Sequence, residues 1–140
     1  MEHKYFRKQG VVVLVPPQPQ PVLVERLDPP QVEALPGGPV DFQPFRTVID
    51  LKVKLEASPN TYVTQFNPPI TIRIRCTHKD VKRAKLFNYL KLGYWDGKKW
   101  VHCTAKTHKF QLEVDKTIKY AGWGIIQISN WDDPIPTWGT

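Results

Sequence analysis

The sequence lacks the features of disulfide-rich, membrane-spanning and exported chains. It has only two cysteines, Cys76 and Cys103, which are too few for a disulfide framework and are expected to be buried thiols or one disulfide. Its early apolar run, Val11–Val15, stops at a proline pair and is too short for a signal-peptide core. No run approaches the ~20 apolar residues of a membrane-spanning helix. We therefore expect a soluble chain without a transmembrane segment.

Catalytic signatures are also missing. The sequence contains no Gly-x-Ser-x-Gly, no phosphate-cradling glycine-rich loop and no His-Glu-x-x-His. The potential zinc ligands in its second half are Cys76, His78, His102, Cys103 and His108. None of them shows the Cys-x2-Cys or His-x3-His spacing typical of zinc sites. We therefore predict a protein that is not an enzyme, holds no metal and needs no cofactor.

Proline, in contrast, is abundant, with 14 residues that concentrate toward the N-terminus. Residues 1–46 are predicted to form an extended proline-rich arm, in which two β-prone segments, Val11–Val15 and Val22–Leu27, flank a polyproline-type spacer. Such an arm can lie on its own domain or on a neighbouring chain. We predict that it adds a strand to an exposed sheet edge of a protein partner or a second copy. The candidate partner-binding residues are Val11, Val13, Val15, Val22 and Val24.

From residue 47 onward, apolar and polar residues alternate with period two. The clearest runs are 49–56 and 70–76, and further strands are predicted at 62–66, 90–95, 99–103, 108–114 and 123–129. A capping box at Thr77 and Asp80 predicts one short helix over 78–87. This pattern favours an all-β fold, either an antiparallel sandwich or a barrel, and we expect a β-sandwich of about seven strands over residues 47–130. Residues 131–140 form a tail with Trp and Pro that is expected to dock on the sandwich.

The most specific local feature is a hairpin around an Asp-Gly pair, which favours a tight turn. With Tyr94 toward the core, Trp95 is expected to face solvent and to pair across the hairpin with Trp100. The two rings are interpreted either as a structural cross-strand pair or as a stacking platform for a sugar or a base. In the second case Lys98 and Lys99 supply positive charge.

The net charge of +7 is distributed unevenly. Residues 1–40 carry as many acidic as basic side chains, so the excess lies in residues 41–140. Arg73 and Arg75 are expected on the strand face opposite the apolar stripe, as a solvated face or as a surface that binds nucleic acid or acidic polysaccharide. The candidate residues of that surface are Arg73, Arg75, Lys82, Arg83, Lys85, Trp95, Lys98, Lys99 and Trp100.

Two segments carry a resemblance to a known family. They are Phe66-Asn-Pro-Pro-Ile-Thr-Ile-Arg-Ile-Arg and Leu90-Lys-Leu-Gly-Tyr-Trp-Asp-Gly-Lys-Lys-Trp-Val101. Over residues 47–129 the chain resembles bacterial immunoglobulin-like β-sandwich modules, which are common in multidomain envelope or surface proteins. The resemblance implies an immunoglobulin-like fold and a non-enzymatic, structural or adhesive role. The proline-rich arm and the basic excess depart from the family's pattern.

Two functional hypotheses follow. The first is a structural or accessory subunit that binds a protein partner or forms homo-oligomers through its arm and sandwich surface. The second is a binding module for an anionic polymer, either nucleic acid or acidic polysaccharide. The missing signal segment favours the cytoplasm, whereas the resemblance implies the envelope or the extracellular space, so the compartment stays open.

Overall fold

The computed structural model describes residues 1–31, 42–84, 90–95, 98–103, 111–113, 120–130 and 135–139. Strands account for 59% of these residues and helix for 6%. All the strand pairs among them are antiparallel. The predicted all-β class with one short helix is therefore confirmed.

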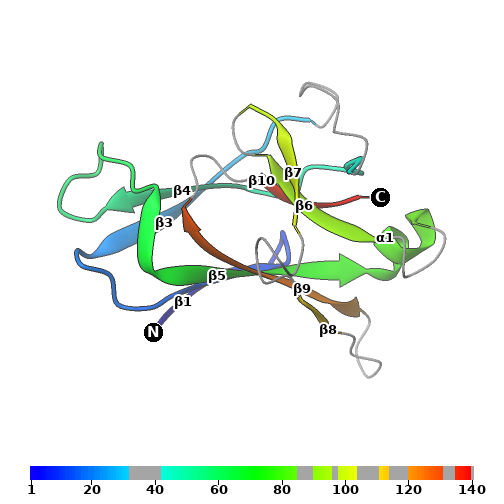
Figure 1. The fold of residues 1–140 in the computed structure, drawn as a ribbon, viewed down its shortest axis with the longest axis horizontal. Coiled ribbons are helices and arrows are strands. Elements are labelled where there is room, and N and C mark those ends of the chain that lie inside the picture. Colours follow the sequence, from blue (N-terminus) through cyan, green and yellow to red (C-terminus); the bar gives the residue numbers. More distant parts are fainter. Residues whose placement is uncertain are drawn as a thin grey trace.

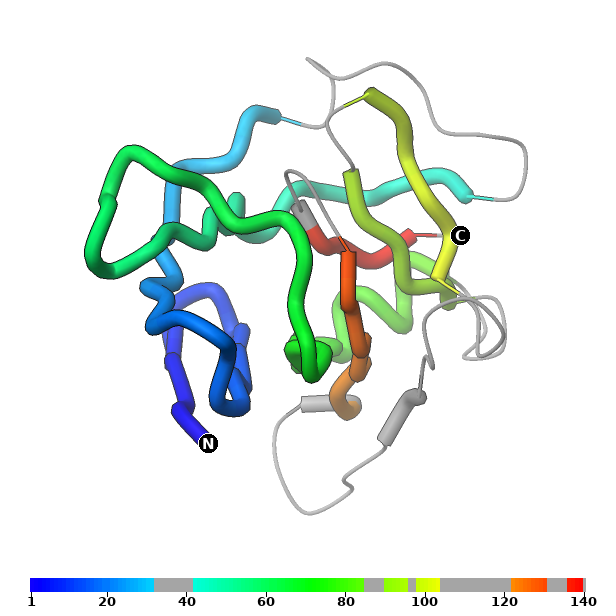
Figure 2. Tube along the Cα trace, turned by 60° about the vertical axis from the view of Figure 1, so that its left-hand side comes forward, coloured from blue at the N-terminus to red at the C-terminus, as the bar shows by residue number. Residues whose placement is uncertain are grey.

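The described strands form three sheets in two layers. The main sheet has the order β1 (Glu2–Phe6), β2 (Val11–Val15), β5 (Gln65–Thr77), β9 (Tyr120–Asn130) and β8 (Gln111–Glu113). A second sheet has the order β10 (Ile135–Gly139), β6 (Lys91–Trp95) and β7 (Trp100–His102), and β3 (Val22–Leu27) pairs with β4 (Asp50–Leu55). Figure 1 shows the two smaller sheets above the main sheet. Figure 2 shows the N-terminal hairpin and β9 on opposite sides of β5.

The proline-rich N-terminal segment belongs to the sheets of this chain. Its two predicted strands have the bounds of β2 and β3. β2 pairs with β5 and β3 pairs with β4, while β1, which the sequence did not predict, pairs with β2. These strands bring the number in the described ranges to ten, where about seven were predicted. Residues 32–41 of the segment lie outside the described ranges, and its described part lies on its own domain, which is one of the two expected placements.

β5 is longer than predicted because two predicted strands join. Segments 62–66 and 70–76 contribute to one strand of 13 residues, with a register shift against β9 between Gln65 and Ile70. From Ile70 to Cys76 every second side chain is buried and the side chains between them are half-buried. Because neighbouring side chains of a strand point to opposite faces, Arg73 and Arg75 lie on the face away from the core.

The helix α1 (His78–Arg83) begins at the predicted capping box. The Thr77 hydroxyl accepts a hydrogen bond from the Asp80 N–H at 3.2 Å, and the Asp80 carboxylate accepts one from the Thr77 N–H at 3.0 Å. The buried Asp80 carboxylate also accepts two hydrogen bonds from the Arg46 guanidinium, at 3.2 and 2.9 Å. The cap therefore ties α1 to the segment before β4. The helix is shorter than the predicted 78–87, of which residues 85–89 lie outside the described ranges.

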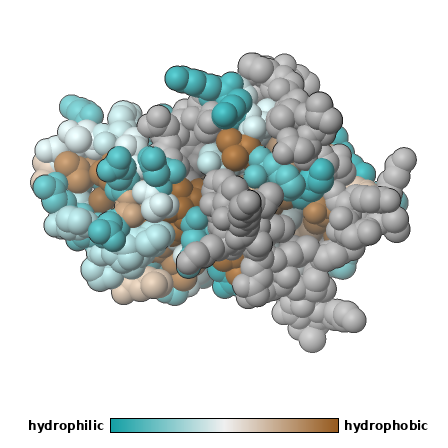
Figure 3. Space-filling model, viewed as in Figure 1, coloured by the Kyte–Doolittle hydropathy of each residue, from teal (hydrophilic) through white to brown (hydrophobic). Residues whose placement is uncertain are grey.

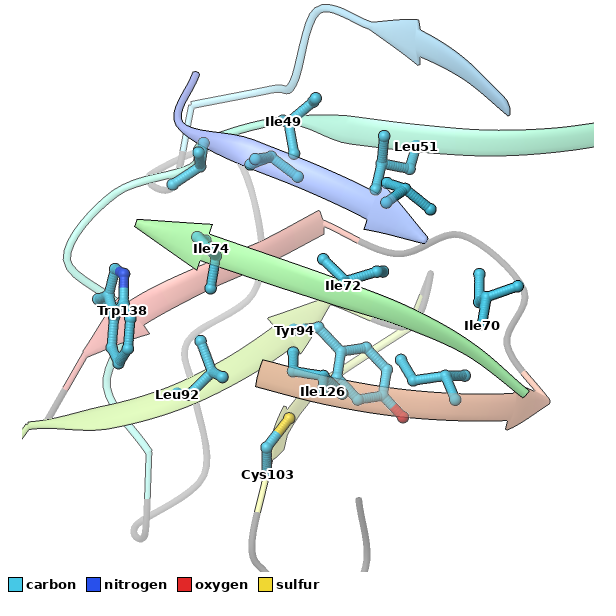
Figure 4. Close-up of a cluster of buried hydrophobic side chains, with 14 of the residues drawn as sticks. Ile49, Leu51, Ile70, Ile72, Ile74, Leu92, Tyr94, Cys103, Ile126 and Trp138 are labelled. Atoms are coloured by element: carbon cyan, nitrogen blue, oxygen red, sulfur yellow. The ribbon is translucent and has the colours of Figure 1, made fainter. Parts of the chain in front are cut away.

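The core fills the space between the main sheet and the smaller sheets. Figure 4 shows Ile72 and Ile74 of β5 on one side of this space, and Leu92 of β6 and Trp138 of β10 on the other. All four side chains have no exposed surface. Burying an apolar side chain of this size contributes roughly 1.5–3 kcal/mol, so the alternation predicted from the sequence provides the main stabilisation.

The C-terminal tail docks as predicted, in the form of strand β10. The Trp138 indole N–H donates a hydrogen bond to the Arg75 carbonyl of β5 at 2.9 Å. The Phe45 N–H donates to the Trp138 carbonyl at 2.9 Å, and the Thr137 hydroxyl donates to the Arg46 carbonyl. The tail therefore connects both layers with the segment that precedes β4. Residues 131–134 lie outside the described ranges.

Candidate functional site

The arm valines predicted to bind a partner pack within the chain itself. Val11, Val13, Val15 and Val24 are buried and Val22 is half-buried. β2 pairs with β5 of the same chain over four residues, so addition of this strand to another molecule requires that it first leave its own sheet. A tethered strand has a far higher effective concentration than a strand of a second molecule, which favours the pairing within the chain.

The two tryptophans of the predicted aromatic platform on the β6–β7 hairpin are buried, and with Phe42 they form what we call the sealed cluster. Trp95 pairs with Trp100 as predicted, with ring centroids 5.5 Å apart in an edge-to-face arrangement. The expectation that Trp95 faces solvent is wrong, because Trp95 and Trp100 are 7% and 2% exposed and form a buried cluster with Phe42. Phe42 packs over Gly93, where a Cβ would lie 2.5 Å from its ring. No sugar or base can stack on rings that the protein already covers.

The other predicted basic residues are divided between the two layers. Lys98 and Lys99 are exposed immediately before β7, in the layer that the two smaller sheets form. Lys82 and Arg83 are exposed on α1, which follows β5 of the main sheet. Lys85 lies outside the described residues. The predicted single surface of nine residues therefore does not form. Of its described members, Arg75 lines one hollow together with Arg73 and a second hollow together with Arg83.

Strand register surrounds the two arginines of β5 with aromatic side chains. Tyr5 of β1 pairs with Val12 of β2, and Val12 pairs with Arg73. Arg75 pairs with Trp123 of β9, and the Arg73 guanidinium lies over the Trp123 ring, 5.2 Å from its centroid. These side chains line a hollow of about 400 Å³, the aromatic hollow. Its lining residues are Tyr5, Arg7, Gly10, Val11, Val12, Arg73, Arg75 and Trp123.

Arg75 also lines a second hollow of about 320 Å³, the basic hollow. Its lining residues are Lys8, Gln9, Arg46, Val48, Arg75, Thr77, Lys79, Asp80 and Arg83. Asp80 is the one carboxylate among them, and it already accepts hydrogen bonds from Arg46 and Thr77. The two hollows meet at Arg75, and together they are lined by seven cationic side chains and one carboxylate.

The β1–β2 turn holds the N-terminal cations beside Arg75. Gly10 has a φ of +70°, and a Cβ there would lie 2.8 Å from the Cβ of Arg75, so only glycine fits this turn without displacement. The Gly10 carbonyl accepts a hydrogen bond from the Arg75 N–H at 2.7 Å. Through this contact the turn places Arg7 in one hollow and Lys8 in the other.

Sequence reasoning missed the residues that the N-terminal hairpin and β9 contribute. Tyr5, Arg7 and Lys8 lie before the first predicted strand, in a region whose net charge is zero. Trp123 is predicted only as the first residue of the strand 123–129. One signal was present in the sequence: His3, Tyr5 and Arg7 alternate, as side chains on one face of a strand do.

Two cysteines lie in the described part of the interior. Cys76 and Cys103 are free and buried, which agrees with the expected pair of buried thiols. Burial raises the pKa of each thiol to about 12, with a smaller contribution from Asp80 at Cys76. Within the described ranges, no three His, Cys, Asp or Glu side chains gather in a way that would hold a metal ion. None of the helical structure described is long and apolar enough to cross a membrane.

Comparisons with known proteins add no relative: no family model, no curated protein and no solved structure matches this chain. The resemblance to bacterial immunoglobulin-like modules therefore rests on the two sequence segments that carry it. A functional conclusion has to come from the chemistry of the two hollows and of the face on which they lie.

Proposed function

We propose that this protein is a non-enzymatic binding module for an anionic polymer. The observation that carries the proposal is the pair of hollows on the outer face of the main sheet and beside α1. Seven Lys and Arg side chains line them, and their one carboxylate is buried and bonded to Arg46 and Thr77. A groove lined by one sign of charge concentrates ligands of the opposite sign.

A polymer fits this arrangement better than a small anion does. The cations come from four elements, β1 with its turn, β5, α1 and the segment before β4, so they are distributed over two adjoining hollows. A chain with regularly spaced charges contacts several of them at once and releases several counterions on binding. Its affinity is therefore expected to fall steeply as salt is added.

Assembly through the N-terminal arm receives less support from the geometry. β2 and β3 already have partners within the chain. On the face that Figure 3 shows, hydrophobic side chains of the described residues reach the surface only in small patches between polar ones. Stable homo-oligomers usually bury a larger apolar area.

The finer assignment of the fold is part of the proposal. We propose an antiparallel β-sandwich, supported by the two layers and by the core they share. An immunoglobulin-like topology is proposed from the sequence resemblance. Sandwiches of this kind support many unrelated binding functions, so the function has to come from the residues on their faces.

Fluorescence anisotropy with three labelled polymers tests the function: a heparin fragment, a single-stranded oligonucleotide and a DNA duplex. We expect the protein to bind at least one of them at 50 mM salt. Contacts to about four phosphates predict that affinity falls between 50 and 200 mM salt by roughly fiftyfold for the single strand and by roughly 150-fold for the duplex. No binding to any polymer at 50 mM salt contradicts the proposal.

A matched pair of double variants locates the site. Arg73→Gln/Arg75→Gln is expected to reduce affinity about tenfold or more and to lower the salt slope by about two, one per cation removed. Lys98→Gln/Lys99→Gln removes the same charge from the layer opposite the main sheet and is expected to change affinity less than about threefold. Equal losses from the two variants show that net charge alone attracts the polymer, which contradicts a site on the main sheet.

A further inference from the structure

We propose that the polymer is a single-stranded nucleic acid, with one base in the aromatic hollow and the neighbouring phosphates in the basic hollow. This inference rests on the proposed function and specifies its ligand. It comes from a feature that charge alone does not explain, which is the row of flat side chains on one face of β1.

Three planar groups, those of His3, Tyr5 and Arg7, stand at alternate positions along β1 and the turn that follows it. Tyr5 is 53% exposed, and its ring centroid lies 6.1 Å from that of His3 and 5.9 Å from the Arg7 guanidinium carbon. Aromatic rings and guanidinium planes are the groups on which unpaired bases stack in proteins that bind single strands. Because Tyr5 is the most exposed ring of the aromatic hollow, it is the one that offers its face to a base.

The width of the hollow suits one base. Tyr5 and Arg73 are separated by β2, whose Val12 forms the apolar floor between them. Two strand spacings place their backbones roughly 10 Å apart. A flat base in contact with both side chains needs their planes about 7–8 Å apart, which side chains on these strands can reach. Trp123 supports the far wall, because the Arg73 guanidinium lies on its ring.

The expected position of the phosphates follows from the next cations along β5. Arg75 lies two residues beyond Arg73, about 6.6 Å along the strand, and belongs to both hollows. A base held at Arg73 therefore brings its sugar–phosphate backbone to Arg75. From there Lys8 and Lys79 line the path into the basic hollow.

Two other polyanions match this geometry less well. A duplex keeps its bases stacked and paired, so no base face reaches Tyr5. A sulfated polysaccharide can place a sugar against a ring, but it has no planar group to fill the space between the Tyr5 ring and the Arg73 guanidinium, so it uses mainly the cations. Of the three polymers, a single strand therefore makes the fullest use of both hollows.

The experiment compares a labelled single-stranded oligothymidine with an abasic strand of the same length, a DNA duplex and a heparin fragment. Each is titrated by anisotropy into wild type and the Tyr5→Leu, Arg75→Gln and Tyr62→Leu variants. Tyr62 is the matched control, because it is 55% exposed and has two lysines over its ring but belongs to the other layer. Thermal midpoints of the variants, measured in parallel, confirm that each is folded.

We expect oligothymidine to bind about tenfold more tightly than the abasic strand. Tyr5→Leu is expected to remove most of that difference and to leave abasic binding unchanged, while Tyr62→Leu changes neither. Arg75→Gln is expected to weaken both strands and to lower the salt slope by about one. Equal binding of oligothymidine and the abasic strand, or tighter binding of duplex or heparin, overturns this inference and leaves the proposed function standing. Failure of all four polyanions to bind overturns the proposed function itself.

Discussion

Two regions of this molecule combine tryptophan with basic residues, and they differ in whether the rings are covered. In the β6–β7 hairpin, Trp95 and Trp100 form a buried cluster with Phe42, and among the hairpin residues that the structure describes only Lys98 and Lys99 are exposed. On the main sheet, Tyr5 is open to solvent and Trp123 supports an arginine. Tryptophan and lysine close together in a sequence therefore identify a structural cluster in this fold. The open face is assembled from strands that are far apart in the chain.

The largest expected effect is on the sealed cluster. Trp100→Ala is expected to lower the free energy of unfolding by about 3–5 kcal/mol, because it leaves a cavity beside Phe42. Polyanion affinity is expected to stay unchanged in conditions where the variant is folded. Urea titration followed by circular dichroism measures the first effect and anisotropy the second.

A second substitution keeps this prediction testable if the alanine variant fails to fold. The Trp100 indole N–H is buried and has no hydrogen-bond partner among the described residues. Trp100→Phe removes that unpaired donor and retains a ring. We therefore expect it to lower the free energy of unfolding by less than half as much as Trp100→Ala does. A phenylalanine variant as unstable as the alanine variant contradicts the sealed arrangement.

The next effect concerns the thiols of the interior. With a pKa of about 12, Cys76 and Cys103 are expected to react with Ellman's reagent at pH 8 on the order of a thousandfold more slowly than in the unfolded chain. The unfolded thiols ionise near pH 9, whereas the folded ones stay protonated to about pH 12. Stability is therefore expected to fall as pH rises from 9 to 12. Rapid labelling of native protein at pH 8 contradicts this.

A smaller effect is expected at the glycine beneath Phe42. The Cβ of a Gly93→Ala variant would meet the Phe42 ring at 2.5 Å, so the ring has to move. We expect a loss of about 1–3 kcal/mol and stronger quenching of tryptophan emission by acrylamide, because Trp95 and Trp100 lose their cover. An unchanged stability and quenching constant show that Phe42 does not seal the cluster.

The smallest effect on stability is expected on the open face. Tyr5→Leu changes a side chain that is 53% exposed, and we expect the free energy of unfolding to change by less than about 0.5 kcal/mol. Urea titration measures it beside Trp100→Ala. If Tyr5→Leu lowers the free energy of unfolding nearly as much as Trp100→Ala, Tyr5 belongs to the core. The two regions then no longer differ in whether their aromatic rings are buried.

Local patterns predicted the elements well. The strands Val11–Val15 and Val22–Leu27 have the predicted bounds, and the capping box of α1 forms with Thr77 and Asp80 as expected. The alternation from Ile70 to Cys76 placed the isoleucines inside and the arginines outside. Each of these features depends on residues that are close together in the sequence, which is why it could be predicted from the sequence alone.

The candidate site was predicted only in part because it depends on distant pairings. Alternation shows which residues share a face, but not what covers that face. Phe42 reaches Trp95 and Trp100 from more than 50 residues away, and no local signal marks it. Tyr5 and Arg73 line one hollow only because β2 pairs with both β1 and β5. The sequence alone identified Arg73 and Arg75 as site residues. The order of the strands was needed to assign four further residues to the site: Tyr5, Arg7, Lys8 and Trp123.

The N-terminal hairpin has a double role, which couples ligand occupancy to local opening. Its β2 valines complete the core, while Tyr5, Arg7 and Lys8 complete the two hollows. Any fluctuation that peels β2 from β5 dismantles the recognition surface and uncovers a sheet edge at the same moment. A bound polymer opposes that fluctuation, and at a hundred times its dissociation constant it adds about 2.7 kcal/mol to the opening free energy. Amide exchange in β2 therefore becomes a reporter of whether the face is occupied.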